Sequence, residues 1–168
     1  QRGPGIGEGY GTYNGGAGYG GRGGSGCDPR FGGPVYGSLT APVDPGSGGF
    51  GHSSYLNVSG WGGGLFRIQA AGTVTVNGTI SVNGSAAQQT YGTGGSGGGI
   101  AIQCQTFGGA ASGLLSVQGG IPYTSYGAGG GGGRIALDFQ NLAVEHGVRF
   151  AAGGGTNSWA TMDRDNFF

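Results

Sequence analysis

The residues Gly97-Gly98-Gly99-Ile100-Ala101-Ile102-Gln103-Cys104 join a cluster of glycines to a stretch in which every second residue is isoleucine or cysteine. Such an alternation is typical of a β-strand that buries one face. The chain contains this arrangement three times, because glycine clusters also lead into Phe66-x-Ile68 and Ile135-x-Leu137-x-Phe139. The sequence therefore predicts a repeat built around a β-strand.

The repeat has a period of about 35 residues, within the range of the repeats that build solenoids. Tyr55, Tyr91 and Tyr126 mark the same position in successive units. In each unit the tyrosine is followed by a glycine cluster, a first alternating strand, a connector and a second alternating strand. The predicted second strands are Ile80-x-Val82, Leu115-x-Val117 and Val148-x-Phe150. The predicted units are 55–90, 91–125 and 126–155.

The fold predicted from this repeat is all-β. One unit offers too few apolar residues to make a core, whereas stacked units place equivalent side chains in continuous rows. We therefore predict a β-solenoid, similar to a parallel β-helix. The predicted rows are Phe66, Ile100, Ile135; Ile68, Ile102, Leu137; Ile80, Leu115, Val148; and Val82, Val117, Phe150. The alternative is an antiparallel β-sandwich or a hairpin meander, because Val76-Asn77-Gly78-Thr79 favours a type I′ turn.

The composition excludes several classes of protein. Glycine makes up 48 of the 168 residues without a Gly-X-Y period, so the chain is not collagen. Close-packed glycine clusters are expected to adopt an extended, polyproline-II-like form that is hydrogen-bonded to neighbouring segments. The seven basic residues balance seven acidic ones, which leaves no basic patch to hold nucleic acid. No apolar stretch is long enough to span a bilayer.

The two ends of the chain differ from the repeats. We predict that residues 1–33 form a Gly/Tyr-rich arm or cap, that 34–155 form the repeat domain, and that 156–168 form a tail. Aromatic residues in the ends are predicted to contact other copies of the chain, because aromatic rings supply large contact areas. These residues are Tyr10, Tyr13, Tyr19, Trp159, Phe167 and Phe168.

Two covalent features are open at this point. Cys27 and Cys104 either form one disulfide in an oxidising compartment or remain thiols, and their spacing fits no metal motif. Asn57, Asn77 and Asn83 each begin an Asn-x-Ser/Thr sequon and are candidate sites of N-glycosylation.

The sequence offers little for catalysis. Asp138 and Glu145 are the acidic residues within the repeats, and Asp138 alternates with inward-facing neighbours, so we expect it to face solvent. His146 lies next to Glu145, but adjacent residues on a strand face opposite sides, and His52 has no acidic residue near it in sequence. We therefore expect no enzyme activity, no cofactor and no metal site.

The stretch Tyr36-Gly37-Ser38-Leu39-Thr40-Ala41-Pro42-Val43-Asp44-Pro45-Gly46-Ser47-Gly48-Gly49 resembles the lead-in of large glycine-rich repeat proteins that are secreted or surface-displayed by bacteria and some protists. In those proteins units similar to Gly-Gly-Gly-x-Ile-x-Ile and Gly-Thr-Ile-x-x-Asn-Gly follow, as they do here at 62–68 and 78–84. The resemblance covers about residues 34–155. It implies a large extracellular protein and brings no catalytic residue.

We therefore expect a structural subunit of an extracellular fibre, sheath or surface layer that assembles with itself, with bound or covalent glycan as a further partner. The first alternative is an adhesin or glycan-binding module that uses Tyr55, Tyr91, Tyr126 and Trp61 for stacking on sugars. The second alternative is a carbohydrate-active enzyme on a β-helix.

Overall fold

The structure, a computed structural model, describes residues 3–10, 13–26, 31–51, 59–124 and 126–156. These residues form strands and extended segments and contain no helix. The strands are β1 (Gly9–Tyr10), β2 (Tyr13–Asn14), β3 (Leu65–Gln69), β4 (Thr73–Thr75), β5 (Thr79–Ser81), β6 (Gly99–Gly109), β7 (Leu114–Ser116), β8 (Arg134–His146) and β9 (Arg149–Ala151). The prediction of an all-β chain is confirmed.

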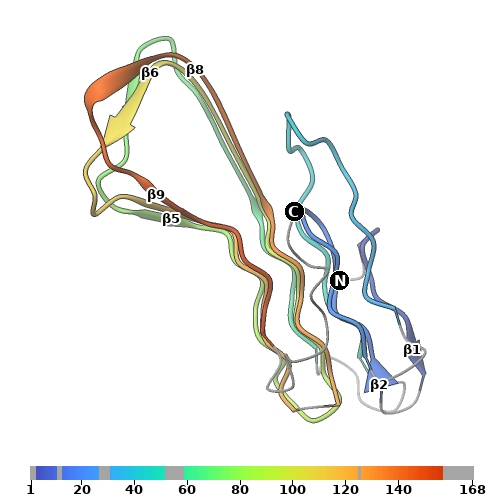
Figure 1. Ribbon diagram of the computed structural model, residues 1–168. Helices are drawn as coiled ribbons and strands as arrows, with labels where there is room; N and C mark the ends of the chain where they lie inside the picture. Colours follow the sequence, from blue (N-terminus) through green and yellow to red (C-terminus); the bar gives the residue numbers. More distant parts are fainter. Residues whose placement is uncertain (1–2, 11–12, 27–30, 52–58, 125, 157–168) are drawn as a thin grey trace.

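The strands of the three repeats pair in parallel, one repeat upon the next (Figure 1). We refer to residues 59–90, 91–124 and 126–155 as the first, second and third repeats. One sheet has the order β3-β6-β8, with β4 also paired to β6, and the other has the order β5-β7-β9. The second repeat therefore lies between the other two.

This pairing argues against a hairpin meander. The Asn77-Gly78 pair joins β4 to β5, but β4 pairs with β6 and β5 pairs with β7, both in parallel. The predicted rows through Phe66 and Ile68 are confirmed, because Ile100 pairs with both Phe66 and Ile135, and Ile102 with both Ile68 and Leu137.

The predicted position of Phe150 is wrong. Phe150 pairs with Leu115, in the row predicted for Val148, so the second strand of the third repeat is shifted by two residues. The predicted pair Leu115–Val148 is 33 residues apart, whereas the observed pairs Leu115–Phe150 and Ile100–Ile135 are both 35 residues apart. A register irregularity of β8 between its pairings with Phe107 and Gly109 is local and does not change the register of β9.

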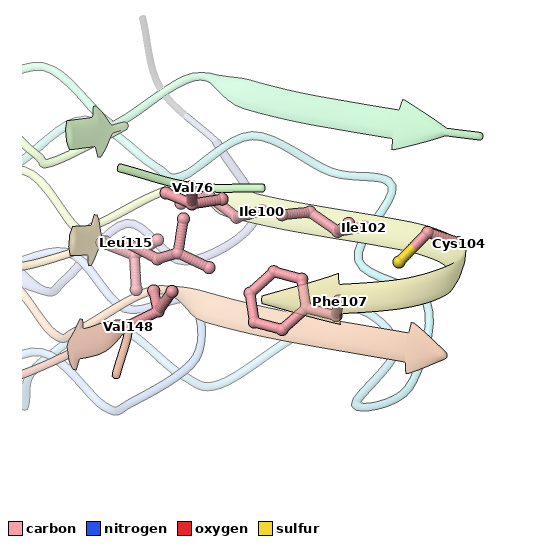
Figure 2. Close-up of a cluster of buried hydrophobic side chains, with 8 residues drawn as sticks. Val76, Ile100, Ile102, Cys104, Phe107, Leu115 and Val148 are labelled. Atoms are coloured by element: carbon pink, nitrogen blue, oxygen red, sulfur yellow. The ribbon is translucent and has the colours of Figure 1, made fainter. Parts of the chain in front are cut away.

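A small apolar core lies between the two sheets. Figure 2 shows its side chains pointing toward one another from β6, β7 and the segments beside them. The largest fully buried members, Ile100, Ile102 and Leu115, all belong to the second repeat. The core cluster comprises Val76, Ile100, Ile102, Cys104, Phe107, Leu115, Val117 and Val148.

Beyond the strands, each repeat continues into glycine-rich segments that lie side by side in the lower half of Figure 1. We refer to this half as the glycine bundle: residues 59–64, 82–99, 117–133 and 152–155 with the N-terminal segments beside them. Gly94 and Gly97 donate backbone hydrogen bonds to the third repeat, whereas Gly95 and Gly98 donate to residues 82–85 of the first. Ser96 donates to the N-terminal arm. A period of three is that of a polyproline II helix, in agreement with the expected conformation.

The direction of each Cα–Cβ bond follows the same period. A β-carbon added at Gly95 or Gly98 would overlap the carbonyl oxygen of Trp61 or Gly64 in the preceding repeat. A β-carbon added at Gly97 would overlap the carbonyl oxygen of Val117, in the segment that follows β7 of the same repeat. In the second repeat the third direction, toward the arm, holds the side chain of Ser96. At the equivalent positions of the other repeats, Gly62 and Gly131, a β-carbon would overlap a carbonyl oxygen of the arm. Backbone contact therefore requires glycine at most positions of the bundle, with exceptions such as Gly64 at the end of the stack.

The N-terminal arm adds further segments to the glycine bundle (Figure 1). Segments before and after residue 33, the predicted end of the arm, both belong to the glycine bundle. Gly18 donates a backbone hydrogen bond to Gly5, and Gly46 donates one to Gly63. Small hydroxyl groups attach the arm to the repeats: the backbone N–H of Ser47 donates to Ser96 Oγ at 2.8 Å.

Candidate functional site: the two end faces of the stack

Among the residues that the structure describes, none forms a further repeat on the third one. Its strand β8 is 13 residues long, and no described strand pairs with its outer edge. Leu142 is 55% exposed and Phe150 54%, whereas their neighbours in the second repeat, Phe107 and Leu115, are buried. Val144 is fully exposed. This face, which we refer to as the third-repeat face, combines a free strand edge with apolar side chains.

The first repeat ends the stack differently in the glycine bundle. Trp61 stands at the position that Gly95 and Gly130 occupy in the later repeats, and Ser85 stands at the position of Gly120 and Gly155. Trp61 is 65% exposed. The backbone N–H of Trp61 donates to Ser85 Oγ at 2.8 Å, a bond that the later repeats replace by one to a backbone carbonyl. We refer to this end as the first-repeat face.

Polar side chains also continue from repeat to repeat on the outer surface of the first sheet. Gln69 donates to Gln103 at 3.0 Å, and Gln103 donates to the carboxylate of Asp138 at 3.0 Å. Asp138 is exposed, and its carboxylate lies on this outer surface, as predicted. It ends a side-chain ladder that crosses all three repeats.

The predicted assembly contacts divide into two groups. Tyr19 is fully buried within its own chain, with its ring 4.8 Å from that of Tyr36 and beneath the guanidinium of Arg134, so its prediction as a contact to other copies is not supported. The ring packs inward because the adjoining glycines bring the backbone segments close together. The side chains of Tyr10 and Tyr13, together with Trp159, Phe167 and Phe168, lie outside the described residues.

Burial changes the acidity of three groups. It raises the pKa of Tyr19, and the positive charge of Arg134 acts in the opposite direction. Burial also raises the pKa of Tyr36, against the effect of the hydrogen bond from Ser47. Cys104 is a buried free thiol whose pKa is raised by desolvation, whereas Cys27 lies outside the described residues. Cys104 is therefore a core residue with the reactivity of a neutral thiol.

Two sequons are exposed at the ends of strands. Asn77 Oδ1 accepts a hydrogen bond from the backbone N–H of Ala110, and Asn83 Oδ1 accepts one from the N–H of Gln118. Both bonds use the amide oxygen and leave the amide nitrogen, the atom that carries an N-glycan, for other partners. Asn57 lies outside the described residues.

A cleft of about 460 Å³ lies at the far tip of the glycine bundle, lined by Gln89, Thr90, Tyr91 and Tyr123. Tyr91 has φ of 68°, a conformation that is uncommon for a residue with a side chain. Its ring lies 5.7 Å from that of Tyr126, so two of the predicted sugar-stacking residues come together. Trp61 belongs to the first-repeat face, and Tyr55 lies outside the described residues.

Groups suited to acid–base chemistry are not brought together. The imidazole of His146 lies 2.9 Å from the carbonyl oxygen of Ala143 in its own strand. Among the described residues, no three His, Cys, Asp or Glu side chains form a cluster that could hold a metal ion. His52 lies outside the described residues.

The chain matches no known family model, no curated protein and no solved structure. The described part of the chain also contains no helix that is long and apolar enough to cross a bilayer.

Sequence reasoning did not identify the first-repeat face. The signal was present in the alignment of the repeats, because Trp61 and Ser85 are the residues that replace glycine at two positions where both later repeats have it. Without knowledge of which way each Cα–Cβ bond points, those replacements could not be distinguished from ordinary variation.

Proposed function

We propose that the protein is a structural subunit of an extracellular fibre, sheath or surface layer, in which a β-solenoid domain associates with other copies of itself. The observation that supports this proposal is the third-repeat face. A strand edge offers a row of unpaired N–H and C=O groups, and the natural partner of such an edge is another strand.

Features that usually protect a strand edge are absent from most of β8. Proteins blunt their edges with short strands, lysine, proline or inward-pointing charges. Residues 139–144 of β8 carry no charge, and this stretch includes the exposed side chains of Phe139, Leu142 and Val144. Charged residues occur outside this stretch, at Arg134, Asp138 and Glu145, and the register irregularity of β8 is confined to the part of the strand after Leu142. The face is suited to burial against a second copy.

Replacement of apolar residues on this face tests the proposal. Light scattering of the wild-type chain at increasing concentration is expected to show self-association. The double variant Leu142→Lys/Val144→Lys is expected to remain monomeric, because two charges would be buried in the joint. Leu39→Lys is the matched control, since Leu39 is 76% exposed and lies in the N-terminal arm. A wild-type chain that stays monomeric at every concentration would refute the proposal.

The extracellular location rests on the resemblance of residues 36–49 and on the two exposed sequons. Mass spectrometry of the protein purified from its native source, before and after enzymatic removal of N-glycans, tests the glycan at Asn77 and Asn83. We expect each modified asparagine to be converted to aspartate by that treatment. Recovery of both as unmodified asparagine would remove the glycan from the proposal.

The tyrosine cleft supports a second candidate function, the binding of a neutral glycan. Aromatic rings stack on the apolar faces of sugars, and the Gln89 amide and Thr90 hydroxyl can bond to sugar hydroxyls. The unusual backbone of Tyr91 is the kind of strain that is found at binding sites.

A glycan array separates the two functions. Binding of the wild-type chain that is lost in Tyr91→Ala and Tyr123→Ala, but kept in Trp61→Ala, would support the glycan-binding function. Equal binding by all four proteins, or none by any, would exclude this cleft.

A further inference from the structure

We infer that Trp61 and Ser85 form a stop at the first-repeat face, so that the repeats of two copies stack only through their third-repeat faces, as closed pairs. This inference rests on the proposed self-association and specifies its first step: the closed pair is the building block of the fibre, sheath or layer, and pairs join through surfaces other than the ends of the repeat stack. Two other joints are conceivable, third repeat to first repeat or first repeat to first repeat, and the contacts within the chain show what the former would require.

Steric overlap excludes a joint that continues the repeat. In the chain itself, a β-carbon at Gly130 would overlap the carbonyl oxygen of Gly95, and one at Gly95 would overlap that of Trp61. A copy stacked in front of the first repeat would bring its own Gly130 carbonyl to the same place relative to Trp61. At that place the carbonyl oxygen would meet the β-carbon and indole of Trp61, whereas in the later repeats it meets only the Cα hydrogen of a glycine.

Ser85 opposes the same joint at a second point. A β-carbon at Gly120 would overlap the carbonyl oxygen of Ser85, and one at Gly155 would overlap that of Gly120. Ser85, the next position in this series, carries a side chain directed toward the place of a preceding repeat. Two side chains therefore stand where a stacked copy would need two glycines.

The backbone N–H of Trp61 has a hydrogen-bond acceptor without a preceding copy. Gly95 donates to the carbonyl of Ser85, and Gly130 donates to the carbonyl of Gly120, each one repeat earlier. Trp61 has no earlier repeat to supply this carbonyl, and its N–H donates to Ser85 Oγ instead. The Ser85 hydroxyl thus accepts the hydrogen bond that a carbonyl of a stacked copy would otherwise accept from Trp61, which removes one reason for a copy to bind at this face.

The strand half of the first repeat cannot form the joint alone. Glycines 62–64 lead directly into β3, so the two halves of a repeat keep a fixed spacing. An indole that holds two copies apart in the glycine bundle also separates their strand edges, and ladder hydrogen bonds need an N–O distance of about 3 Å.

In the third repeat, glycines Gly130 and Gly155 occupy the positions of Trp61 and Ser85, so within the described part of the chain this face carries no such stop. A joint between two identical faces is isologous and closes after two copies, whereas a joint between two different faces repeats without limit. The stop therefore decides between a pair and an open-ended stack.

The double variant Trp61→Gly/Ser85→Gly tests the inference. Analytical ultracentrifugation of the wild-type chain is expected to show a mass that levels off at about twice that of the monomer. The double variant is expected to show a mass that keeps rising with concentration. Tyr123→Gly is the matched control, because Tyr123 is similarly exposed but lies in the cleft, and it should behave as wild type.

A comparison of the wild-type chain, Trp61→Gly/Ser85→Gly and the same variant with Leu142→Lys/Val144→Lys added distinguishes failure of the inference from failure of the proposed function. Adding Leu142→Lys/Val144→Lys to Trp61→Gly/Ser85→Gly should abolish the open-ended growth, because every joint that uses the third-repeat face is then lost. A wild-type chain without any association refutes the proposed function. A wild-type pair that is unchanged in the double variant, while circular dichroism shows the variant to be folded, refutes the stop alone. Open-ended growth of the wild-type chain refutes the stop as well.

Discussion

The two halves of each repeat are held together by opposite means. In the strand half, side chains such as Ile100 and Leu115 fill a conventional apolar core. In the glycine bundle, backbone segments approach so closely that a β-carbon at Gly98 would overlap a carbonyl oxygen. A core can therefore be built from hydrogen-bonded backbone alone, provided that the residues carry no side chains where neighbouring segments approach.

The difference has an energetic consequence. Burial of apolar area stabilises the strand half by about 25 cal/mol per Å². The bundle instead relies on many backbone hydrogen bonds, each with a net contribution of about 1 kcal/mol, against the high entropy cost of ordering glycine. We therefore expect the bundle to be less tolerant of added atoms and the strand half to be less tolerant of removed ones.

The largest effect is expected from an added side chain in the middle of the bundle. Gly98→Val should reduce the free energy of unfolding by about 3 kcal/mol or more, because the new β-carbon has no room beside the Gly64 carbonyl. Gly64→Val is the matched control at the same repeat position, where no atom lies within 4 Å, and it should cost less than about 0.5 kcal/mol. Denaturant titration measures both. Equal losses would mean that close packing does not hold the bundle together.

Removal of atoms from the strand half is expected to come next. Leu115→Ala should reduce the free energy of unfolding by about 2 to 5 kcal/mol, because Leu115 is fully buried in the second repeat. Phe150→Ala removes a larger side chain from the same row but should cost about 1 kcal/mol, because the residue lies on the third-repeat face. Thermal or denaturant unfolding at low protein concentration compares them. A greater loss for Phe150→Ala would place it inside the core.

A smaller effect is expected where a hydroxyl attaches the arm. Ser96→Ala should cost about 1 to 3 kcal/mol, because it leaves the buried N–H of Ser47 without its acceptor. Ser85→Ala also deletes an acceptor, but the N–H of Trp61 can then bond to water, so the cost should stay below about 0.5 kcal/mol. Similar losses in the two variants, measured by denaturant titration, would contradict the view that the arm is integral to the bundle.

The smallest effect is expected in the dependence of stability on pH. Burial raises the pKa of Tyr19 and Tyr36, so the unfolded chain releases these protons first as the pH rises. Stability should therefore be complete below the ordinary tyrosine pKa of about 10 and decline above it. Tyr36→Phe should make this decline shallower while Tyr19 and Cys104 remain as in the wild type. An unchanged slope in denaturant titrations across this range would contradict a raised pKa at Tyr36.

Much of the strand half could be predicted from the sequence, because alternation reports which side chains share a face. The rows through Ile100 and Ile102 follow directly from that pattern. The predicted row through Leu115 has the wrong third member, because Gly147 does not take the place of Gly113 before the strand, and Val148 does. The spacing of 35 residues that joins Ile100 to Ile135 leads correctly from Leu115 to Phe150.

The end faces could not be predicted. Trp61 is the type of residue found in binding sites, and Tyr19 is the type found in assembly contacts. The roles that the structure supports for them depend on the direction in which each side chain points. Tyr19 points inward against Tyr36, and Trp61 points out of the stack at a position where later repeats have glycine.

By itself the sequence determined that the protein is all-β, that its unit is about 35 residues long and that its glycine clusters are extended, because each of these depends on local periodicity and conformational preference. Only the tertiary structure decided which positions of the bundle tolerate a side chain, where the arm lies and which end of the stack carries side chains in place of glycine. Those properties depend on distances of a few ångströms between segments that are far apart in the chain. The carbonyl oxygen that leaves no room for a β-carbon belongs to such a distant segment, so the residues around the glycine do not reveal it.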